Sequence, residues 1–262
     1  MRKSLLSLAV LSALSVPTAV FAEEAAAPAT ATAPAYTVSY NVGLYSQYNF
    51  RGLTQTSEKP AIQGGVDFAH ASGFYLGTWA SNISWLEDGG YYDSSSLELD
   101  LYGGYANTIG ATGIGYNLGV LQYIYPGKKL SSTSANTTEI SGALSYKWLQ
   151  AKVSYIASKD GLNTADAQGT YYAELNANYP IGETGITANL HAGRQEFKGA
   201  SGSNDDLYSY TDWKIGATKS FSNGVNVGGY YSDTNGSDAG YAGYAGGNIA
   251  KSTFTAFVQK TF

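Results

Sequence analysis

Polar and apolar side chains alternate along most of this chain, and that alternation constrains the fold more than any other feature. In the first clear stretch the apolar positions are Tyr36, Val38, Tyr40, Val42, Leu44, Tyr48 and Phe50, and the positions between them are mostly polar. Successive side chains of a β-strand point to opposite faces, so such a stretch predicts a strand with one apolar and one polar face.

Eleven further stretches show the same period of two. They lie at roughly 61–70, 74–83, 96–105, 113–125, 138–148, 150–158, 170–179, 185–194, 210–221, 225–233 and 251–262. After residue 22 no apolar run approaches the ~18 residues that a membrane helix needs. The sequence therefore predicts a protein built from about 12 strands of about ten residues each.

The connections between these strands alternate between short and long. The short ones lie at 71–73, 106–112, 148–149, 180–184 and 222–224, and the long ones at 52–60, 84–95, 126–137, 159–169, 195–209 and 234–250. Short turns on one side and long loops on the other are typical of outer-membrane barrels. We therefore predict an all-β fold, an antiparallel transmembrane up-and-down β-barrel with both chain ends on the periplasmic side.

The aromatic residues support a barrel over its main alternative, a secreted β-sandwich that would bury them in a core. Many of them fall near predicted strand ends, where a membrane barrel carries two interfacial aromatic girdles. These girdle candidates are Tyr36, Tyr48, Tyr105, Tyr123, Tyr125, Trp148, Tyr179, Tyr208, Tyr210 and Phe221.

The two ends of the chain carry export and assembly signals. Arg2 and Lys3 precede an apolar stretch and the small residue Ala22, so residues 1–22 are predicted to be a signal peptide. A retained anchor is the less favoured alternative. Residues 23–35 are rich in Ala, Pro and Thr and are predicted to form a periplasmic tether, and 36–262 form the barrel. The terminal aromatic Phe262 is similar to the signal read by the barrel assembly machinery.

Composition excludes several functional classes. The net charge of −5 argues against nucleic acid as a partner, and the absence of Cys excludes thiol chemistry and thiolate metal sites. Only His70 and His191 could act as an imidazole base, and no Gly-x-Ser-x-Gly nucleophile motif is present. We expect no enzymatic activity, no metal and no cofactor.

Charged residues with the polar parity should face the barrel interior, because a Lys or Arg facing lipid at mid-bilayer costs about 2–4 kcal/mol. The predicted pore-lining residues are Asp67, Glu98, Asp100, Glu139, Lys147, Lys152, Glu174, His191, Asp212 and Lys214. Six acids against three lysines predict a mildly cation-preferring interior. The alternative is that these charges pair across the interior and seal it, as happens in small barrels.

Arg51 has the interior parity at the end of the first predicted strand, which places it at the outer mouth of the pore. Two roles are open. It could attract anionic groups at a constriction, or it could pair with an acid of the same loop such as Glu58, and the second interpretation is favoured.

The stretch Ser46-Gln47-Tyr48-Asn49-Phe50-Arg51-Gly52-Leu53-Thr54-Gln55-Thr56 resembles the opening of the TorF family of porin-like proteins. The resemblance continues through 59–67, 77–82 and 98–105. It implies a proteobacterial outer-membrane barrel that forms a pore, and it assigns neither a substrate nor catalytic residues.

These observations favour a porin or narrow channel in the outer membrane of a Gram-negative cell. It would pass small hydrophilic solutes by passive diffusion and lie among outer-membrane lipid and lipopolysaccharide. The alternative is a non-conducting barrel whose extracellular loops, rich in Gly, Tyr and Asp, bind a partner or a surface.

Overall fold

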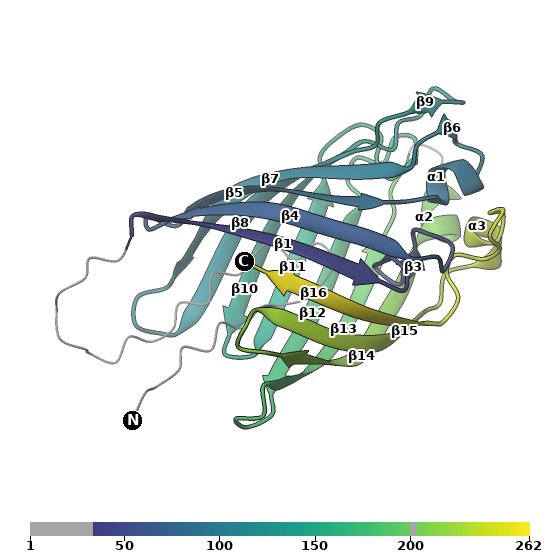
Figure 1. Cartoon of the computed structure of the whole chain (residues 1–262). Coiled ribbons are helices and arrows are strands. Elements are labelled where there is room, and N and C mark those ends of the chain that lie inside the picture. The colour runs from purple at the N-terminus through teal and green to yellow at the C-terminus, as the bar shows by residue number, and fades with distance from the viewer. Residues whose placement is uncertain (1–33, 200–202) are drawn as a thin grey trace, which may run out of the picture.

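The computed structural model describes residues 34–199 and 203–262, and these form one closed antiparallel β-barrel (Figure 1). The barrel strands are β1 (Tyr36–Tyr45), β4 (Ala61–His70), β5 (Phe74–Asn82), β7 (Leu97–Thr108), β8 (Ile114–Ile124), β10 (Thr137–Tyr146), β11 (Leu149–Ile156), β12 (Tyr171–Pro180), β13 (Ile186–Glu196), β14 (Tyr210–Ser220), β15 (Val225–Thr234) and β16 (Thr253–Thr261). The predicted signal peptide, 1–22, and most of the predicted tether, 23–35, lie outside the described residues.

The barrel closes by pairing its first strand with its last. Each strand pairs with its neighbour in the chain, and β1 also pairs with β16 from Asn41–Thr261 to Tyr45–Phe257. The twelve strands confirm the predicted fold class. The predicted strand ends agree within a few residues except at the first strand, which ends at Tyr45 although the alternation continues to Phe50.

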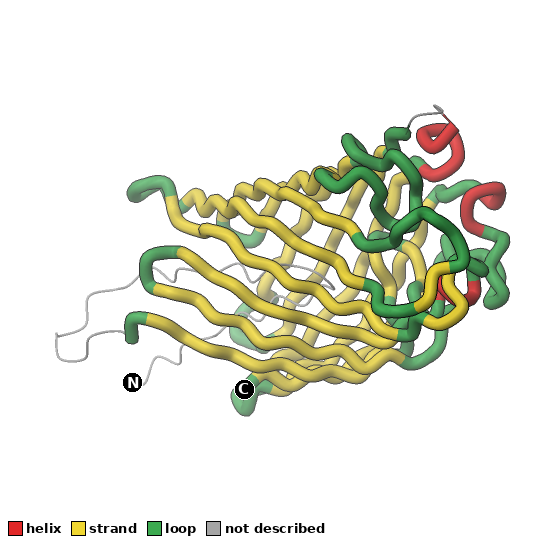
Figure 2. Tube along the Cα trace, turned by 90° about the horizontal axis from the view of Figure 1, so that it is seen from above, coloured by secondary structure: helices red, strands yellow, loops and turns green. Residues whose placement is uncertain are grey.

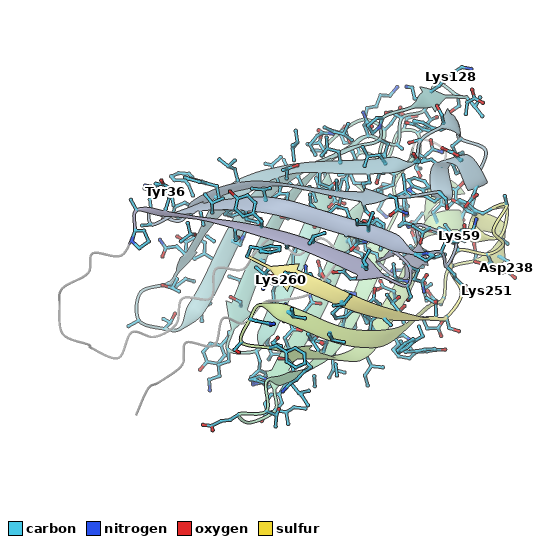
Figure 3. All side chains as sticks on the ribbon, viewed as in Figure 1. Tyr36, Lys59, Lys128, Asp238, Lys251 and Lys260 are labelled. Carbon is cyan, nitrogen blue, oxygen red and sulfur yellow. The ribbon has the colours of Figure 1, made fainter. Side chains whose placement is uncertain are left out.

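The two ends of the barrel differ in the length of their connections (Figure 2). One end, called here the turn end, carries the short turns 71–73, 109–113, 147–148, 181–185 and 221–224 and the C-terminal residue Phe262. The opposite end, called the loop end, carries the longer connections 46–60, 83–96, 125–136, 157–170, 197–209 and 235–252. Tyr36 and Lys260 lie towards the turn end, whereas Lys59, Lys128, Asp238 and Lys251 lie at the loop end (Figure 3).

The outer face of the wall is apolar over most of its height. Apolar side chains exposed there include Val42 and Leu44 of β1, Leu118 and Val120 of β8, Leu175 of β12, Ile215 of β14 and Val258 of β16. A hydrocarbon solvent accepts such a surface only if every backbone polar group is paired internally, and a closed sheet meets that condition.

The aromatic girdle predicted from the sequence is present only in part. Tyr36, Trp148, Tyr179 and Phe221 are exposed at the turn end, as a membrane interface requires. Tyr48, Tyr123, Tyr125 and Tyr210 are instead buried at the loop end. The prediction was wrong for these four because proximity to a strand end does not tell whether a side chain points outward or inward.

The loop end is covered by short elements that pack on one another (Figure 1). They are the helices α1 (Trp85–Asp88), α2 (Ser203–Tyr208) and α3 (Asp238–Tyr241) and the paired strands β6 (Tyr92–Ser94) and β9 (Lys128–Lys129). The paired strands β2 (Asn49–Phe50) and β3 (Leu53–Thr54) belong to residues 46–60 and are not counted among these covering elements. Two clusters of buried apolar residues hold this cap, one around Trp85 and Tyr125 and the other around Tyr210 and Tyr241. Within 34–199 and 203–262, no helix has the length and apolarity needed to cross a membrane.

An arginine placed on the outer face should destabilise the barrel far more than one placed on the inner face. We expect Val153→Arg on the exposed outer face of β11 to cost about 2–4 kcal/mol of folding free energy in lipid vesicles. Gln150→Arg, on the inner face of the same strand, is the matched control and should cost much less. Denaturant titration of the refolded proteins measures both, and equal losses would contradict the assigned faces.

Candidate functional site

The interior of the barrel is filled at the loop end and accessible from the turn end. Inward-facing side chains near the loop end are buried, among them Gln63, Ser81, Glu98, Asp100, Glu139, Ser154, Tyr172, Gln195, Asp212 and Ser232. Inward-facing side chains nearer the turn end are only half-buried, among them Asp67, Tyr102, Lys152, Asn176, Asn178, Asn189, His191 and Lys214. The interior is therefore a polar chamber that narrows from the turn end towards the loop end.

The filling at the loop end comes mainly from residues 46–60, the first long connection. Tyr45 and Ala61 are direct partners in the pairing of β1 with β4, so residues 46–60 form an insertion between two paired residues. Within this segment the hairpin β2–β3 turns at Arg51 and Gly52, both with positive φ. A Cβ atom on Gly52 would lie 2.8 Å from the Cβ of Asp212 on the wall, so this close approach requires glycine.

The side chain of Arg51 contacts the part of the wall opposite β1, the strand that precedes its segment. Its Nη2 donates to Glu139 Oε2 on β10 at 2.8 Å, and its Nη1 donates to Gln195 Oε1 on β13 at 3.0 Å. The guanidinium carbon lies 4.3 Å from the ring centre of Tyr172 on β12. β10 and β12 flank β11, the strand diametrically opposite β1 in the barrel order, and β13 is the next strand after β12. The side chain of Arg51 is only 8% exposed, so this contact is an interior ion pair.

Tyr48 anchors the same segment to another part of the wall. Its hydroxyl donates to Glu98 Oε1 on β7 at 2.8 Å, and its ring packs edge-on against Trp79 of β5 with ring centres 5.4 Å apart. Burial and the adjacent Glu98 carboxylate raise the pKa of Tyr48 well above its usual value. The hydroxyl therefore stays protonated and keeps its role as the donor.

Further hydrogen bonds join residues 46–60 to the cap and to the last strand. Gln47 donates to the side chain of Thr253 and to the carbonyl of Phe254 on β16. The amide of Thr54 donates to the carbonyl of Ile249 at 3.0 Å, and Ser57 Oγ donates to Asp88 Oδ2 at 2.5 Å. The segment is consequently connected to several sides of the barrel and to the loops above it.

The acidic residues of the interior have very different surroundings. Asp67 accepts a hydrogen bond from the hydroxyl of Tyr102, and Glu139 accepts from Arg51 and from Tyr123. Asp100 is fully buried, and neither of its carboxylate oxygens has a hydrogen-bond partner among the described residues. Residues 34–199 and 203–262 contain no group of three or more acidic or histidine side chains arranged to hold a metal ion.

His191 lies in a connected network on the wall that faces the acidic residues of β7. Asn176 donates through Nδ2 to Glu174 at 2.9 Å, and its Oδ1 therefore faces His191 Nδ1 at 2.7 Å. On the other side of the ring, His191 Nε2 lies 3.0 Å from Asp212 Oδ1, and the Tyr172 hydroxyl donates to the other oxygen of Asp212 at 2.8 Å. Both ring nitrogens thus lie within hydrogen-bond distance of oxygen atoms, since His191 Nε2 also lies 2.8 Å from the Tyr172 hydroxyl.

Lysines complete this wall. Lys152 lies 3.7 Å from Glu174, and Lys214 lies 5.0 Å from the ring centre of Tyr230. The predicted pore-lining residues Lys152, Glu174, His191, Asp212 and Lys214 therefore come together on β11–β14. The predicted residues Asp67, Glu98, Asp100 and Glu139 lie on β4, β7 and β10, on other parts of the inner face.

Two predicted site residues lie elsewhere than expected. Lys147 does not face the interior, because β10 ends at Tyr146 and Lys147 takes a positive φ in the exposed turn before β11. Arg51 does not end the first barrel strand at an open mouth, because β1 ends at Tyr45 and the chain turns inward. Its acidic partner is Glu139 rather than Glu58.

Sequence reasoning missed the aromatic and amide residues of the site. Tyr48, Tyr172 and Gln195 contact Arg51 or Glu98 directly, yet they were assigned to a girdle or left unassigned. The alternating parity of β12 and β13 does place Tyr172 and Gln195 inward, so a signal was present for these two. No local signal in the sequence points Tyr48 towards Glu98.

The fold and its two faces define the class as a closed twelve-stranded β-barrel with an apolar exterior and a charged interior. The chain belongs to the family described as "Bacterial protein of unknown function (Gcw_chp)", whose model matches residues 28–262. That description names no activity, so membership by itself establishes neither a TorF assignment nor transport. No curated protein matches the chain.

Two solved structures with a similar fold are a porin and an outer-membrane channel. The KdgM porin superposes with a TM-score of 0.51 at 9% identity, covering 86% of this chain and 99% of that one. The COG4313 outer membrane channel from Pseudomonas putida F1 superposes with a TM-score of 0.50 at 14% identity, covering 88% and 97%. At these identities the likeness shows a shared barrel fold.

Removing the acidic partner of Arg51 should loosen residues 46–60. A hydrogen bond to a charged group contributes about 1.5–3 kcal/mol, so Glu139→Gln should raise the opening equilibrium of this segment about tenfold or more. Hydrogen exchange of the amides of 46–60 in the refolded protein measures the change. Glu174→Gln, which alters an interior acid that contacts no residue of the segment in the described structure, is the matched control. Equal exchange in both variants would contradict the anchoring role of Glu139.

Proposed function

We propose that this protein is a porin-like channel of the Gram-negative outer membrane that passes small hydrophilic solutes by passive diffusion. The observation that carries the proposal is the reversal of polarity across the wall of a closed barrel. The outer face is apolar, whereas the inner face carries Asp67, Glu98, Asp100, Glu139, Glu174, Asp212, Lys152, Lys214 and His191. Water-soluble matter can cross a bilayer along such an inner face.

Orphaned polar groups argue against an interior that is sealed by ion pairs. Gln63 Nε2, Ser154 Oγ, Ser232 Oγ and both carboxylate oxygens of Asp100 have no hydrogen-bond partner among the described residues, although all are buried. Buried polar groups are almost always satisfied by protein or by ordered water. A barrel sealed by its own side chains would pair these groups with one another, and the described residues do not.

The interior charges favour cations. Six carboxylates face inward, against the cations Arg51, Lys152 and Lys214 and the imidazole of His191. Fixed charges that line a pore raise the local concentration of ions of opposite sign. The net negative interior therefore supports a mild preference for cations.

Residues 46–60 would act as the constriction. Tyr48 and Arg51 connect them to β7, β10, β12 and β13, so the segment fills the interior at the loop end. Passage through the barrel requires this segment to move away from the opposite wall. On the opposite wall the segment is held by the side chain of Arg51, whose contacts can break when a loop opens on the microsecond-to-millisecond scale.

An outer-membrane channel would also have the cellular context that the sequence predicts. Export by the segment 1–22, recognition of Phe262 by the assembly machinery and contact with lipopolysaccharide all belong to an outer-membrane location. Membership of the TorF porin group would add the same pore-forming role. The function needs no catalytic residue and no cofactor.

A second function is favoured by the packing of the loop end. The cap contains buried apolar clusters, and residues 46–60 close the interior beneath it. A barrel closed in this way could serve as a rigid platform whose loops bind a partner or a surface. A correctly folded protein without conductance, together with loss of surface binding after trimming of 235–252, would support this second function.

Neutralising interior acids should reduce the preference for cations. In water, a unit charge changes the free energy of an ion 10 Å away by about 0.4 kcal/mol. This corresponds to about a twofold change in the local concentration of that ion. We expect Asp67→Asn to lower the potassium-to-chloride permeability ratio about threefold to fourfold, because the local cation concentration falls about twofold and the local anion concentration rises about twofold. Reversal potentials in a salt gradient across a planar bilayer measure this ratio.

Asp93→Asn is the matched control for this measurement. Asp93 lies on the exposed surface of the loop end, where it pairs with Lys128. Its neutralisation should leave the permeability ratio unchanged. An unchanged ratio in Asp67→Asn would exclude this carboxylate from the ion path.

A further inference from the structure

The guanidinium of Arg51 occupies a fully formed cation site on the opposite wall. The site supplies a carboxylate oxygen of Glu139 at 2.8 Å, an amide oxygen of Gln195 at 3.0 Å and the face of Tyr172 at 4.3 Å. The neighbouring ring of Phe50, with its centre 4.7 Å from the guanidinium carbon, covers the group further. The two oxygens accept from the N–H donors of this planar cation, and the aromatic rings lie against its face. Both ways in which proteins recognise a guanidinium are therefore present here.

The wall residues of this site are held in place by contacts other than Arg51. Gln195 Nε2 donates to the carbonyl of Tyr171 at 3.1 Å, which orients its Oε1 towards the guanidinium. The Tyr172 hydroxyl donates to Asp212 at 2.8 Å, and Tyr123 donates to Glu139 at 3.2 Å. The acceptors and the ring are therefore preorganised and would stay in position if Arg51 left.

The segment that delivers Arg51 is strained. Arg51 itself has φ of 49°, and Ser57 and Glu58 of the same segment have φ of 49° and 60°. A residue other than glycine in this region is strained and persists only where surrounding contacts hold it. Binding of Arg51 to the wall is thus opposed by the backbone that carries it.

We propose that Glu139, Gln195 and Tyr172 form a binding site for the guanidinium group of a small cationic solute, with Arg51 as its tethered occupant. A free guanidinium compound competes with Arg51, and its binding releases residues 46–60 from the opposite wall. The ligand site stands on its own geometry, whereas the opening of a path by the ligand rests on the proposed channel function. An alkylammonium group binds more weakly, because it lacks the planar fork that meets Glu139 and Gln195 together.

The test uses the refolded mature chain, residues 23–262, in detergent micelles, with methylguanidinium chloride as the probe at constant ionic strength. Isothermal titration calorimetry compares the wild-type protein with Arg51→Ala. A tethered group competes at an effective concentration in the millimolar range or above, so removal of Arg51 should tighten probe binding by about tenfold or more. Methylammonium chloride, titrated into the same variant, should bind at least about tenfold more weakly than methylguanidinium.

Two further variants locate the site. Arg51→Ala combined with Glu139→Gln should lose the gain in affinity, because the carboxylate partner is gone. Lys152→Ala removes an interior cation that does not contact this site and should bind the probe as weakly as the wild-type protein. Each variant is first shown to be folded by its mobility in unheated gel electrophoresis, so that a failure to bind is not a failure to fold.

Each outcome bears on the site separately from the channel. The proposal is overturned if Arg51→Ala binds methylguanidinium no more tightly than the wild-type protein does. It is also overturned if the double variant binds methylguanidinium as tightly as Arg51→Ala does, or if Arg51→Ala binds methylammonium as tightly as methylguanidinium. Because heat of binding is measured, a barrel that conducts no ions still reports on the site. A barrel that conducts ions while Arg51→Ala gains no affinity overturns the site and leaves the channel function standing.

Discussion

The closed hydrogen-bonded ladder is the constraint on which the rest of this structure depends. A bilayer offers no partner for a free backbone amide or carbonyl, so a sheet that crosses it must have no edge. Here the pairing of β1 with β16 removes the last edge. Once the sheet is closed, the period of two assigns every side chain to lipid or to the interior, and the apolar exterior and the charged interior both follow.

Closure also explains why the interior is organised by contacts between distant parts of the chain. Twelve strands enclose more space than their own inward side chains fill at the loop end, and residues 46–60 occupy that space. Arg51 joins the first connection of the chain to β10 and β13, and Tyr48 joins it to β7. The same segment therefore determines how much of the interior is filled at the loop end and which interior charges are paired.

The sequence predicted the barrel and the faces of its strands well, because both depend on local alternation and on local turn residues. It failed where alternation continues beyond the end of a strand. Tyr48 and Phe50 continue the pattern of β1 but belong to the inward-folded segment, and Lys147 keeps the interior parity although it lies in a turn. The partners of Arg51 and His191 come from strands far away in the chain, and no local pattern encodes which inward-facing residues meet across a barrel.

Residues 46–60, anchored on the opposite wall, would limit passage through the proposed channel. Tyr45 and Ala61 are direct partners, so a short Gly/Ser turn can replace residues 47–59 without disturbing the ladder. The most direct measurement is the single-channel conductance of this variant beside that of the intact protein in a planar bilayer. The account predicts larger, stepwise and ohmic conductance for the variant. Equal conductance in the two proteins, or none in either when both are folded, would contradict it.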